Sequence, residues 1–276
     1  MENLFRLMDS PRFTVVTPVL NGERYISETI ESVLAQSYPH WRYIIMDGGS
    51  TDSTLAIANS YAETDDRITV ASGKDKGMYD ALFKGLELDD GEICCWINAD
   101  DKYVPWSFSI VADAVLNGHD WVTGYHAFWD MHGRLITTGL PRMYPRWLIR
   151  AGYCHGRGLG FIQQESTFFT RKLLSRLSEE QLHTLRSMKM AGDFGLWKLL
   201  AEHASLYELQ TVIGGFRVHE SNMSGSAMEE YYEEVKQLGG KYLPYFIKEI
   251  PKAFLQVIAL IRSRQAKRAT LRELGR

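Results

Sequence analysis

The amino-acid sequence predicts an α/β fold built on a mostly parallel sheet flanked by helices. The first observation is that short apolar segments alternate with segments of helical spacing from residue 13 to residue 101, an order typical of parallel sheets. The second is that all four of these apolar segments run into a polar cluster. The third is composition, because 276 residues that are 45% hydrophobic and 12% aromatic can bury a large core.

Composition also excludes several classes of protein. A net charge of −3 leaves no basic footprint, so we expect no nucleic-acid partner. The three cysteines, Cys94, Cys95 and Cys154, have no zinc spacing and form no even-numbered framework, which favours reduced thiols in the cytoplasm. The first residues lack the apolar core of a signal peptide, and no apolar run approaches the roughly 18 residues of a membrane span.

The first three strands follow from apolar, β-branched segments. Residues 13–16 predict a buried strand, which we expect to end at Thr17 and Pro18 because proline lacks a backbone donor. Residues 26–34 carry apolar side chains at helical spacing. Residues 41–46 and 68–71 predict the next two strands, each followed by a helix.

The fourth strand is the apolar run at residues 93–97, which is followed by the adjacent carboxylates Asp100 and Asp101. Ligands of open α/β sheets bind at the carboxyl ends of strands, where paired carboxylates suit a hard divalent cation. The alternative is a helix cap at Asp101, with Pro105 near the first turn. Each acid alone could be a turn or a cap, but a set of acids after consecutive strands favours a binding site.

The second half of the chain is less regular. A helix is expected after Pro105, then a strand at 121–123 and a hairpin at 125–138. Residues 139–160 show no period, which is typical of functional or mobile loops.

Three further segments close this half of the chain. A short strand is expected at residues 163–169, and a helix begins near Asp193, whose alternative role is an N-cap. The last expected strand ends at His219, where a lone histidine would more often be a hydrogen-bonded surface residue than a ligand.

Two nucleotide-binding motifs are not matched. The loop at residues 48–51 is small and polar, but it lacks the lysine pattern of a P-loop. No G-x-G-x-x-G element follows the first strand, which disfavours a dinucleotide site.

Taken together, the polar segments resemble the family-2 glycosyltransferases of GT-A fold, which are inverting enzymes that use nucleotide-sugars. Residues 47–52 resemble the family's D-[DG]-G-S-x-D element, and residues 98–101 match its D-x-D metal motif in the N-A-D-D form. Residues 75–81 resemble a D-K-G-x-Y-D-A signature of a branch often linked to bacterial surface polysaccharides. The resemblance therefore implies a GT-A type, Rossmann-like sheet.

The later motifs concern the acceptor side. Residues 191–197 resemble the E-D-x-x-L-W region that carries the catalytic base, with Gly192 in place of the usual acid, so Asp193 is the candidate base there. Residues 217–219 resemble a late R-x-H element whose histidine can reach the metal or the diphosphate. Gln163 stands where the family often has a histidine before Gln164.

The resemblance implies specific roles. Asp193 is the expected catalytic base, and a Mg²⁺ or Mn²⁺ ion is expected on Asp101, with Asp100 nearby and His219 as a further ligand or diphosphate contact. The acceptor contacts are Gln164, Glu165 and Trp197. The donor-nucleotide contacts are Thr17, Pro18, Asn21, Asp47, Gly48, Ser50, Asp52, Asp75, Lys76, Gly77, Asp80, Asn98 and Asp100.

The expected activity is inverting transfer of a sugar from a UDP- or dTDP-linked donor to a hydroxyl of a saccharide or lipid-linked acceptor, in bacterial surface polysaccharide or glycolipid synthesis. One alternative is a sugar-1-phosphate nucleotidyltransferase, although residues 17–22 do not supply its glycine- and arginine-rich loop. The other is a non-catalytic nucleotide-sugar-binding module, which would be expected to lose the acids that this chain retains.

The domain expectation is a glycosyltransferase domain at residues 1–225 and a helical extension at residues 226–276. Within the domain, residues 13–123 form the nucleotide-binding half and residues 124–225 the acceptor half. The extension ends in a tail with one acid, Glu273, and six basic residues: Arg262, Arg264, Lys267, Arg268, Arg272 and Arg276. Such a tail is usually a solvated face; the alternative is attraction to anionic lipid, which would place a cytoplasmic protein peripherally at the inner membrane face.

Overall fold

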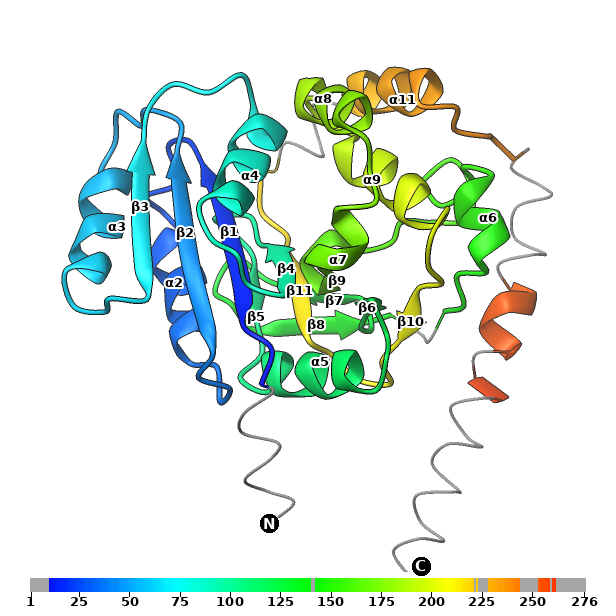
Figure 1. Cartoon of the computed structure of the whole chain (residues 1–276), viewed down its shortest axis with the longest axis horizontal. Helices are drawn as coiled ribbons and strands as arrows, with labels where there is room; N and C mark the ends of the chain where they lie inside the picture. The colour runs from blue at the N-terminus through cyan, green and yellow to red at the C-terminus, as the bar shows by residue number, and fades with distance from the viewer. Residues whose placement is uncertain are drawn as a thin grey trace, which may run out of the picture.

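A computed structural model describes residues 10–139, 142–220, 222, 228–243, 253–258 and 260–261 of the chain. Its main element is a seven-stranded sheet with the order β10-β6-β9-β4-β1-β2-β3 (Figure 1). The strands of this sheet are β1 (Phe13–Val19), β2 (Trp41–Asp47), β3 (Ile68–Ser72), β4 (Ile93–Trp96), β6 (Trp121–Thr123), β9 (Thr167–Thr170) and β10 (Tyr207–Glu208). Only β9 runs antiparallel to its neighbours, so the predicted mostly parallel sheet is confirmed.

A second, four-stranded sheet has the order β5-β11-β7-β8. Its strands are β5 (Lys102–Tyr103), β7 (Ala127–Trp129), β8 (Leu135–Thr138) and β11 (Gly214–Arg217). β5 follows directly after the two aspartates, and β11 pairs with it in antiparallel register. This pairing brings residues near 217 back to the end of β4.

Helices cover both faces of the large sheet (Figure 1). They are α2 (Ile26–Leu34), α3 (Thr54–Ala62), α4 (Met78–Glu87), α5 (Ser107–Leu116), α6 (Arg146–Arg150), α7 (Arg171–Leu174), α8 (Glu179–Ser187), α9 (Gly192–Leu200) and α11 (Met228–Gln237), with a 3₁₀ turn, η1 (Gln164–Ser166). Residues 253–258 and 260–261 are also helical. In the part of the chain that is described, no helix is both long and apolar enough to cross a bilayer.

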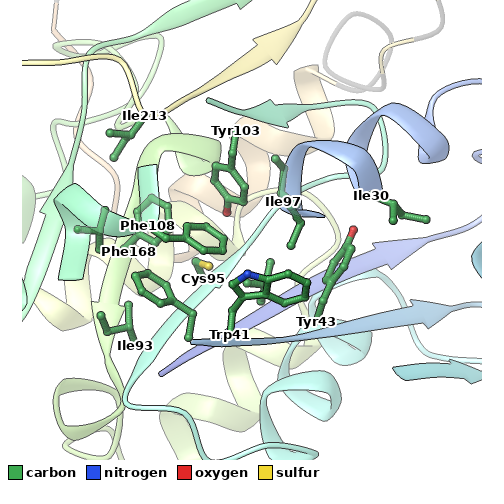
Figure 2. Close-up of a cluster of buried hydrophobic side chains, with 14 of the residues drawn as sticks. Ile30, Trp41, Tyr43, Ile93, Cys95, Ile97, Tyr103, Phe108, Phe168 and Ile213 are labelled. Carbon is green, nitrogen blue, oxygen red and sulfur yellow. The ribbon is translucent and has the colours of Figure 1, made fainter. Parts of the chain in front are cut away.

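Each face of the large sheet has its own core, and alternate residues of one strand serve both cores. Cys95 lies in the core under α2, α3 and α5, where Figure 2 shows it among the rings of Trp41, Phe108 and Phe168. The next residue, Trp96, points to the opposite core and stacks on Trp197 of α9 at a centroid distance of 5.5 Å. This alternation explains why the run at 93–97 is apolar on both faces.

The expected end of the first strand at Thr17 and Pro18 was wrong, since β1 continues to Val19. The Val16 carbonyl accepts the Ile97 N–H on the β4 side, which is where pairing between β1 and β4 stops. Pro18 lies two residues further on, so its nitrogen, which carries no hydrogen, faces the same side at a point beyond the paired part of β4. A proline there costs no ladder hydrogen bond.

Several elements were not predicted, among them β5, β10, α6 and α8. For α8 the sequence did hold a signal: Ser178 and Gln181 form a capping box at its start. The basic tail at residues 262–276 lies outside the described residues.

Candidate functional site

The loops that follow β1 to β4 meet at one edge of the large sheet. A Cβ atom at Gly48 would lie 2.9 Å from Oδ2 of Asp75, and one at Gly22 would lie 3.3 Å from Cβ of Ala99. Both glycines therefore allow neighbouring loops to approach closely. The candidate site is at the carboxyl ends of the parallel strands, where such sheets bind ligands.

Asn21 ties the first loop to the second. Its backbone N–H donates to Ser50 Oγ at 2.8 Å, and its side-chain oxygen accepts the Thr51 N–H at 2.8 Å. To do so it adopts a left-handed φ of 54°, which asparagine tolerates better than most residues. The Gly22 N–H adds a bond to Thr54 Oγ1 at 2.8 Å.

Two acids of the second loop mainly organise the backbone. Asp47 is buried and accepts the N–H groups of Gly49 and Ser50 and, at 2.6 Å, the Ser72 hydroxyl. Burial alone would raise the pKa of Asp47, but these hydrogen bonds outweigh it and lower the pKa. Asp52 accepts both the N–H and the hydroxyl of Thr54 at the start of α3. A direct contact of either acid with a nucleotide stays a prediction.

The segment after β3 is held in a similar way. Asp75 accepts the Gly77 N–H at 2.9 Å, and Asp80 accepts the Lys76 N–H at 3.0 Å and the Lys84 ammonium at 2.7 Å. Gly77 has φ = 131°, which only glycine adopts readily.

Thr17 also has a structural role. It is fully buried, donates to the Ile97 carbonyl and shares a hydrogen bond with the Tyr43 hydroxyl, both at 2.8 Å. Its contact with a nucleotide therefore stays a prediction, as do those of Pro18 and Lys76.

The adjacent aspartates after β4 have different surroundings. Asp101 is fully buried, accepts the Arg217 N–H at 2.8 Å and faces the Asn98 side-chain amide at 3.3 Å. Burial, followed by the charges of Asp100 and Glu165, raises its pKa well above the ordinary value. The Asp100 side chain is 28% exposed, and its Oδ2 lies 2.9 Å from Nε2 of His219. Asp100, not Asp101, therefore presents an accessible carboxylate beside the histidine. The expected metal contacts of both acids stay predictions.

Arg217 connects the turn of the two aspartates to α2. Its buried side chain donates from Nε to the Asp100 carbonyl at 2.6 Å and from Nη2 to Glu28 at 2.9 Å. Its guanidinium lies 4.6 Å from the centre of the Tyr25 ring. The sequence interpretation assigned no role to Arg217, although the R-x-H element contained it.

The residues beside Asp100 fit a divalent cation that also binds phosphate. Asp100 offers a carboxylate and His219 an imidazole, and the buried Asn98 Oδ1 has no partner within the described residues. Across the described stretches no three His, Cys, Asp or Glu side chains group closely enough to hold an ion alone. Substrate oxygens would have to complete the shell, as is usual for Mg²⁺.

Asp193 lies on the acceptor side, in the first turn of α9. Its Oδ1 accepts the Phe194 N–H at 2.7 Å and faces the Tyr79 hydroxyl at 3.4 Å. Burial raises the pKa of Asp193 to about 6, because its effect is larger than the lowering by these two hydrogen-bond donors. A carboxylate with such a pKa is suited to general-base work near neutral pH.

Gly192 is explained by the same tyrosine. A Cβ atom at position 192 would lie 2.6 Å from the Tyr79 ring, so α4 and α9 can approach as they do only because this residue is glycine. The departure of the chain from the E-D pattern therefore has a steric reason.

The three expected acceptor residues are placed differently. Gln164 donates to the Trp96 carbonyl at 2.5 Å, and Trp197 is buried between Trp96 and Trp121 in the core. Glu165 is buried, and its Oε1 has no partner within the described part of the chain.

Burial raises the pKa of Glu165 to about 8, and the charges of Asp100 and Asp193 add to this effect. Glu165 therefore lies within electrostatic range of both the Asp100–His219 pair and Asp193. Of the three residues, it is the one whose surroundings connect the two sides of the site.

A family model described as glycosyl transferase family 2 matches residues 14–177. One relative is the teichuronic acid biosynthesis glycosyltransferase TuaG of Bacillus subtilis, which is 40% identical over 94 residues, or 34% of this chain and 37% of that protein. Another is a PGL/p-HBAD biosynthesis glycosyltransferase of Mycobacterium tuberculosis, 34% identical over 34% of this chain and 38% of that protein. The matched stretch thus spans less than half the length of these relatives.

Solved structures share the fold. TarS from S. aureus in complex with UDP-GlcNAc superposes with a TM-score of 0.59 at 19% identity, over 82% of this chain and 65% of that one. A mannosyltransferase of Pyrobaculum calidifontis in complex with GDP-Man and Mn²⁺ gives a TM-score of 0.53 at 19% identity, over 96% and 79% of the two chains. At these identities the likeness establishes the fold.

Proposed function

The chain belongs to glycosyl transferase family 2, and from that premise we propose that it transfers a sugar, with inversion, from a UDP- or dTDP-linked donor to an acceptor hydroxyl. The observation that carries the proposal is that two unlike centres both act on the buried Glu165: Asp100 beside His219, and Asp193 in the first turn of α9. One centre suits a departing diphosphate and the other a hydroxyl that must lose its proton. The names of the relatives support a place in bacterial surface polysaccharide or glycolipid synthesis.

On the donor side, we assign Asp100 and His219 as the residues that hold Mg²⁺ or Mn²⁺ together with the diphosphate. When bound, the cation would offset the negative charge that develops on the leaving phosphate. Asp101 holds the turn through the Arg217 backbone, and Arg217 fixes the Asp100 carbonyl. The loops around Asn21, Asp47 and Asp75 shape the nucleotide pocket in this proposal.

On the acceptor side, Asp193 takes the proton from the attacking hydroxyl. The Phe194 N–H, which donates to Oδ1 at 2.7 Å, orients the carboxylate. The Tyr79 hydroxyl lies 3.4 Å from Oδ1 and 3.2 Å from the Met190 carbonyl. Inversion follows if the hydroxyl attacks the sugar on the face opposite the diphosphate. Glu165 and Gln164 line the acceptor side, while Trp197 supports them from the core. The proposed acceptor is a saccharide or a lipid-linked saccharide at the inner membrane face.

A panel of nucleotide-sugars tests the function. The full chain is incubated with each donor, with MnCl₂ or with EDTA, and the released nucleotide is measured. We expect slow, metal-dependent release of UDP or dTDP, faster once a suitable acceptor is added. Formation of a nucleotide-sugar from a sugar-1-phosphate and a nucleoside triphosphate would favour the nucleotidyltransferase alternative. Binding without turnover of any donor would favour the non-catalytic module.

A further inference from the structure

The helical residues 253–258 and 260–261 present apolar side chains to solvent. Phe254, Val257 and Ile261 are 64%, 52% and 51% exposed, and their spacing puts them on one helix face. On another side of the helix, Leu255 and Gln256 line a small cavity with residues 142–145, 148, 154 and 159. The helix is therefore seated on the region around α6, while its apolar stripe has no partner among the described residues.

The surroundings of the stripe indicate what covers it. Trp147, on α6, is 67% exposed, and tryptophan favours the boundary between water and lipid. The sequence after Ile261 holds six arginines and lysines against one glutamate. The first two of these, Arg262 and Arg264, follow Ile261 by one and three residues in the sequence. Apolar side chains next to basic ones match the headgroup layer of an anionic bilayer.

We propose that the stripe of Phe254, Val257 and Ile261 inserts into the headgroup layer of an anionic lipid bilayer and holds the enzyme on the membrane surface. The basic residues that follow it would interact with the acidic headgroups. This inference rests on the proposed function in one respect: a lipid-linked acceptor would lie in the same membrane.

Flotation of the full chain with vesicles tests the stripe. We expect binding to phosphatidylcholine vesicles that contain phosphatidylglycerol, weaker binding to phosphatidylcholine alone, and release at high salt. The triple variant Phe254→Ser, Val257→Ser and Ile261→Ser should partition about tenfold less strongly. The matched control is Leu88→Ser with Leu116→Ser, because these leucines are 56% and 51% exposed elsewhere, and it should float like the wild type.

Two results would overturn this proposal. One is equal flotation of the triple variant and the control. The other is a wild-type dimer in sedimentation that the triple variant loses, since a second copy of the chain would then be the occupant. Release of nucleotide from soluble donors should be the same in all three proteins. Its absence in the wild type would contradict the proposed function without affecting the flotation result.

A separate observation concerns Glu234 of α11. Its buried carboxylate accepts three consecutive backbone N–H groups, from Lys189 at 2.8 Å, Met190 at 2.9 Å and Ala191 at 2.8 Å. These residues immediately precede α9 and Asp193. A glutamine cannot replace this arrangement, because its amide nitrogen would face a backbone donor.

We infer that Glu234 is a positioning residue for Asp193 and sets the geometry of the proposed base from the C-terminal extension. The charged and titratable groups that act on Asp193 are Tyr79 from α4, Glu165 from η1, and Tyr231 and Glu234 from α11. After burial, the charge of Glu234 is a further cause of the raised Asp193 pKa. Removing this charge should lower the pKa of the base.

The pH profile tests the role of Glu234. The base acts when deprotonated, so in the wild type kcat/KM should fall as the pH drops below about 6. In Glu234→Gln this fall should occur at lower pH, with kcat reduced about tenfold and donor KM nearly unchanged. The control Glu233→Gln changes an exposed neighbour and should reproduce the wild-type profile.

The pH at which kcat/KM falls on the acidic side of the profile, its acidic limb, does not depend on how much of the enzyme is folded. An unmoved limb in Glu234→Gln, or an equal shift in Glu233→Gln, would overturn the inference. A wrong assignment of Asp193 as the base would give a different result, because turnover would then persist when Asp193 is replaced.

Discussion

Replacing Asp193 by asparagine is expected to lower turnover by a factor of about 10²–10⁴, because general-base assistance typically contributes that much. The amide keeps the size of the side chain and can still accept from Phe194 and Tyr79 through its oxygen. It cannot take a proton from the acceptor hydroxyl. The loss is measured by steady-state kinetics with a nucleotide-sugar that the wild-type protein uses as donor. Calorimetric titration with UDP should show unchanged nucleotide affinity.

Tyr79→Phe provides the matched comparison. It removes the hydroxyl, with its 3.2 Å hydrogen bond to the Met190 carbonyl and its 3.4 Å contact with Asp193 Oδ1, and leaves the ring that packs on Gly192. Its effect on kcat should be much smaller than that of Asp193→Asn. Unchanged turnover in Asp193→Asn would exclude this residue as the base, and a parallel loss of UDP affinity would indicate a structural role instead.

Replacing Arg217 by methionine is expected to reduce both the stability of the protein and its metal-dependent nucleotide affinity. The substitution leaves the Asp100 carbonyl and the Glu28 carboxylate without their buried donor. Hydrogen bonds to charged groups contribute about 1.5–3 kcal/mol, and partial exposure of Glu28 keeps the expected loss near the middle of that range, at about 2 kcal/mol. Urea denaturation measures the stability, and calorimetry with UDP and Mn²⁺ measures the affinity.

Arg134→Met is the control for Arg217. Arg134 also binds a carboxylate, that of Asp130, but its side chain is 75% exposed, so its loss should reduce stability much less than the loss of Arg217. It should leave nucleotide affinity unchanged. Similar losses for the two arginines, or full metal-dependent affinity in Arg217→Met, would contradict the organising role of Arg217.

The first four strands could be predicted because their signals are local. Each is a short apolar run bounded by polar residues, and the helices between them have clear periods. In the smaller sheet, the hairpin of β7 and β8 and the strand β11 could also be predicted. Their assembly with β5 could not, because β5 has two residues and pairs with β11 more than a hundred residues later. No local pattern encodes such a pairing.

The same distinction applies to the candidate site. Motifs single out Asp100, Asp193 and His219 as candidates, since each occupies a characteristic place after a strand or at a helix start. The different burial of Asp100 and Asp101 could not be predicted, because it depends on which carboxylate the distant Arg217 backbone binds. Glu234 was also missed, since its role requires α11 to pack against the segment before α9.

The late position of Arg217 in the sequence has a consequence while the chain is being synthesised. The proposed donor-binding segments all lie before residue 102, yet the Asp100 carbonyl and the Asp101 carboxylate receive their partners from residue 217. His219 and Asn222 reach the same turn later still. A nascent chain that has emerged only as far as α9 therefore holds the proposed donor-binding segments without the groups that fix them. Nucleotide binding should arise late in translation, once β11 has left the ribosome and docked beside β5.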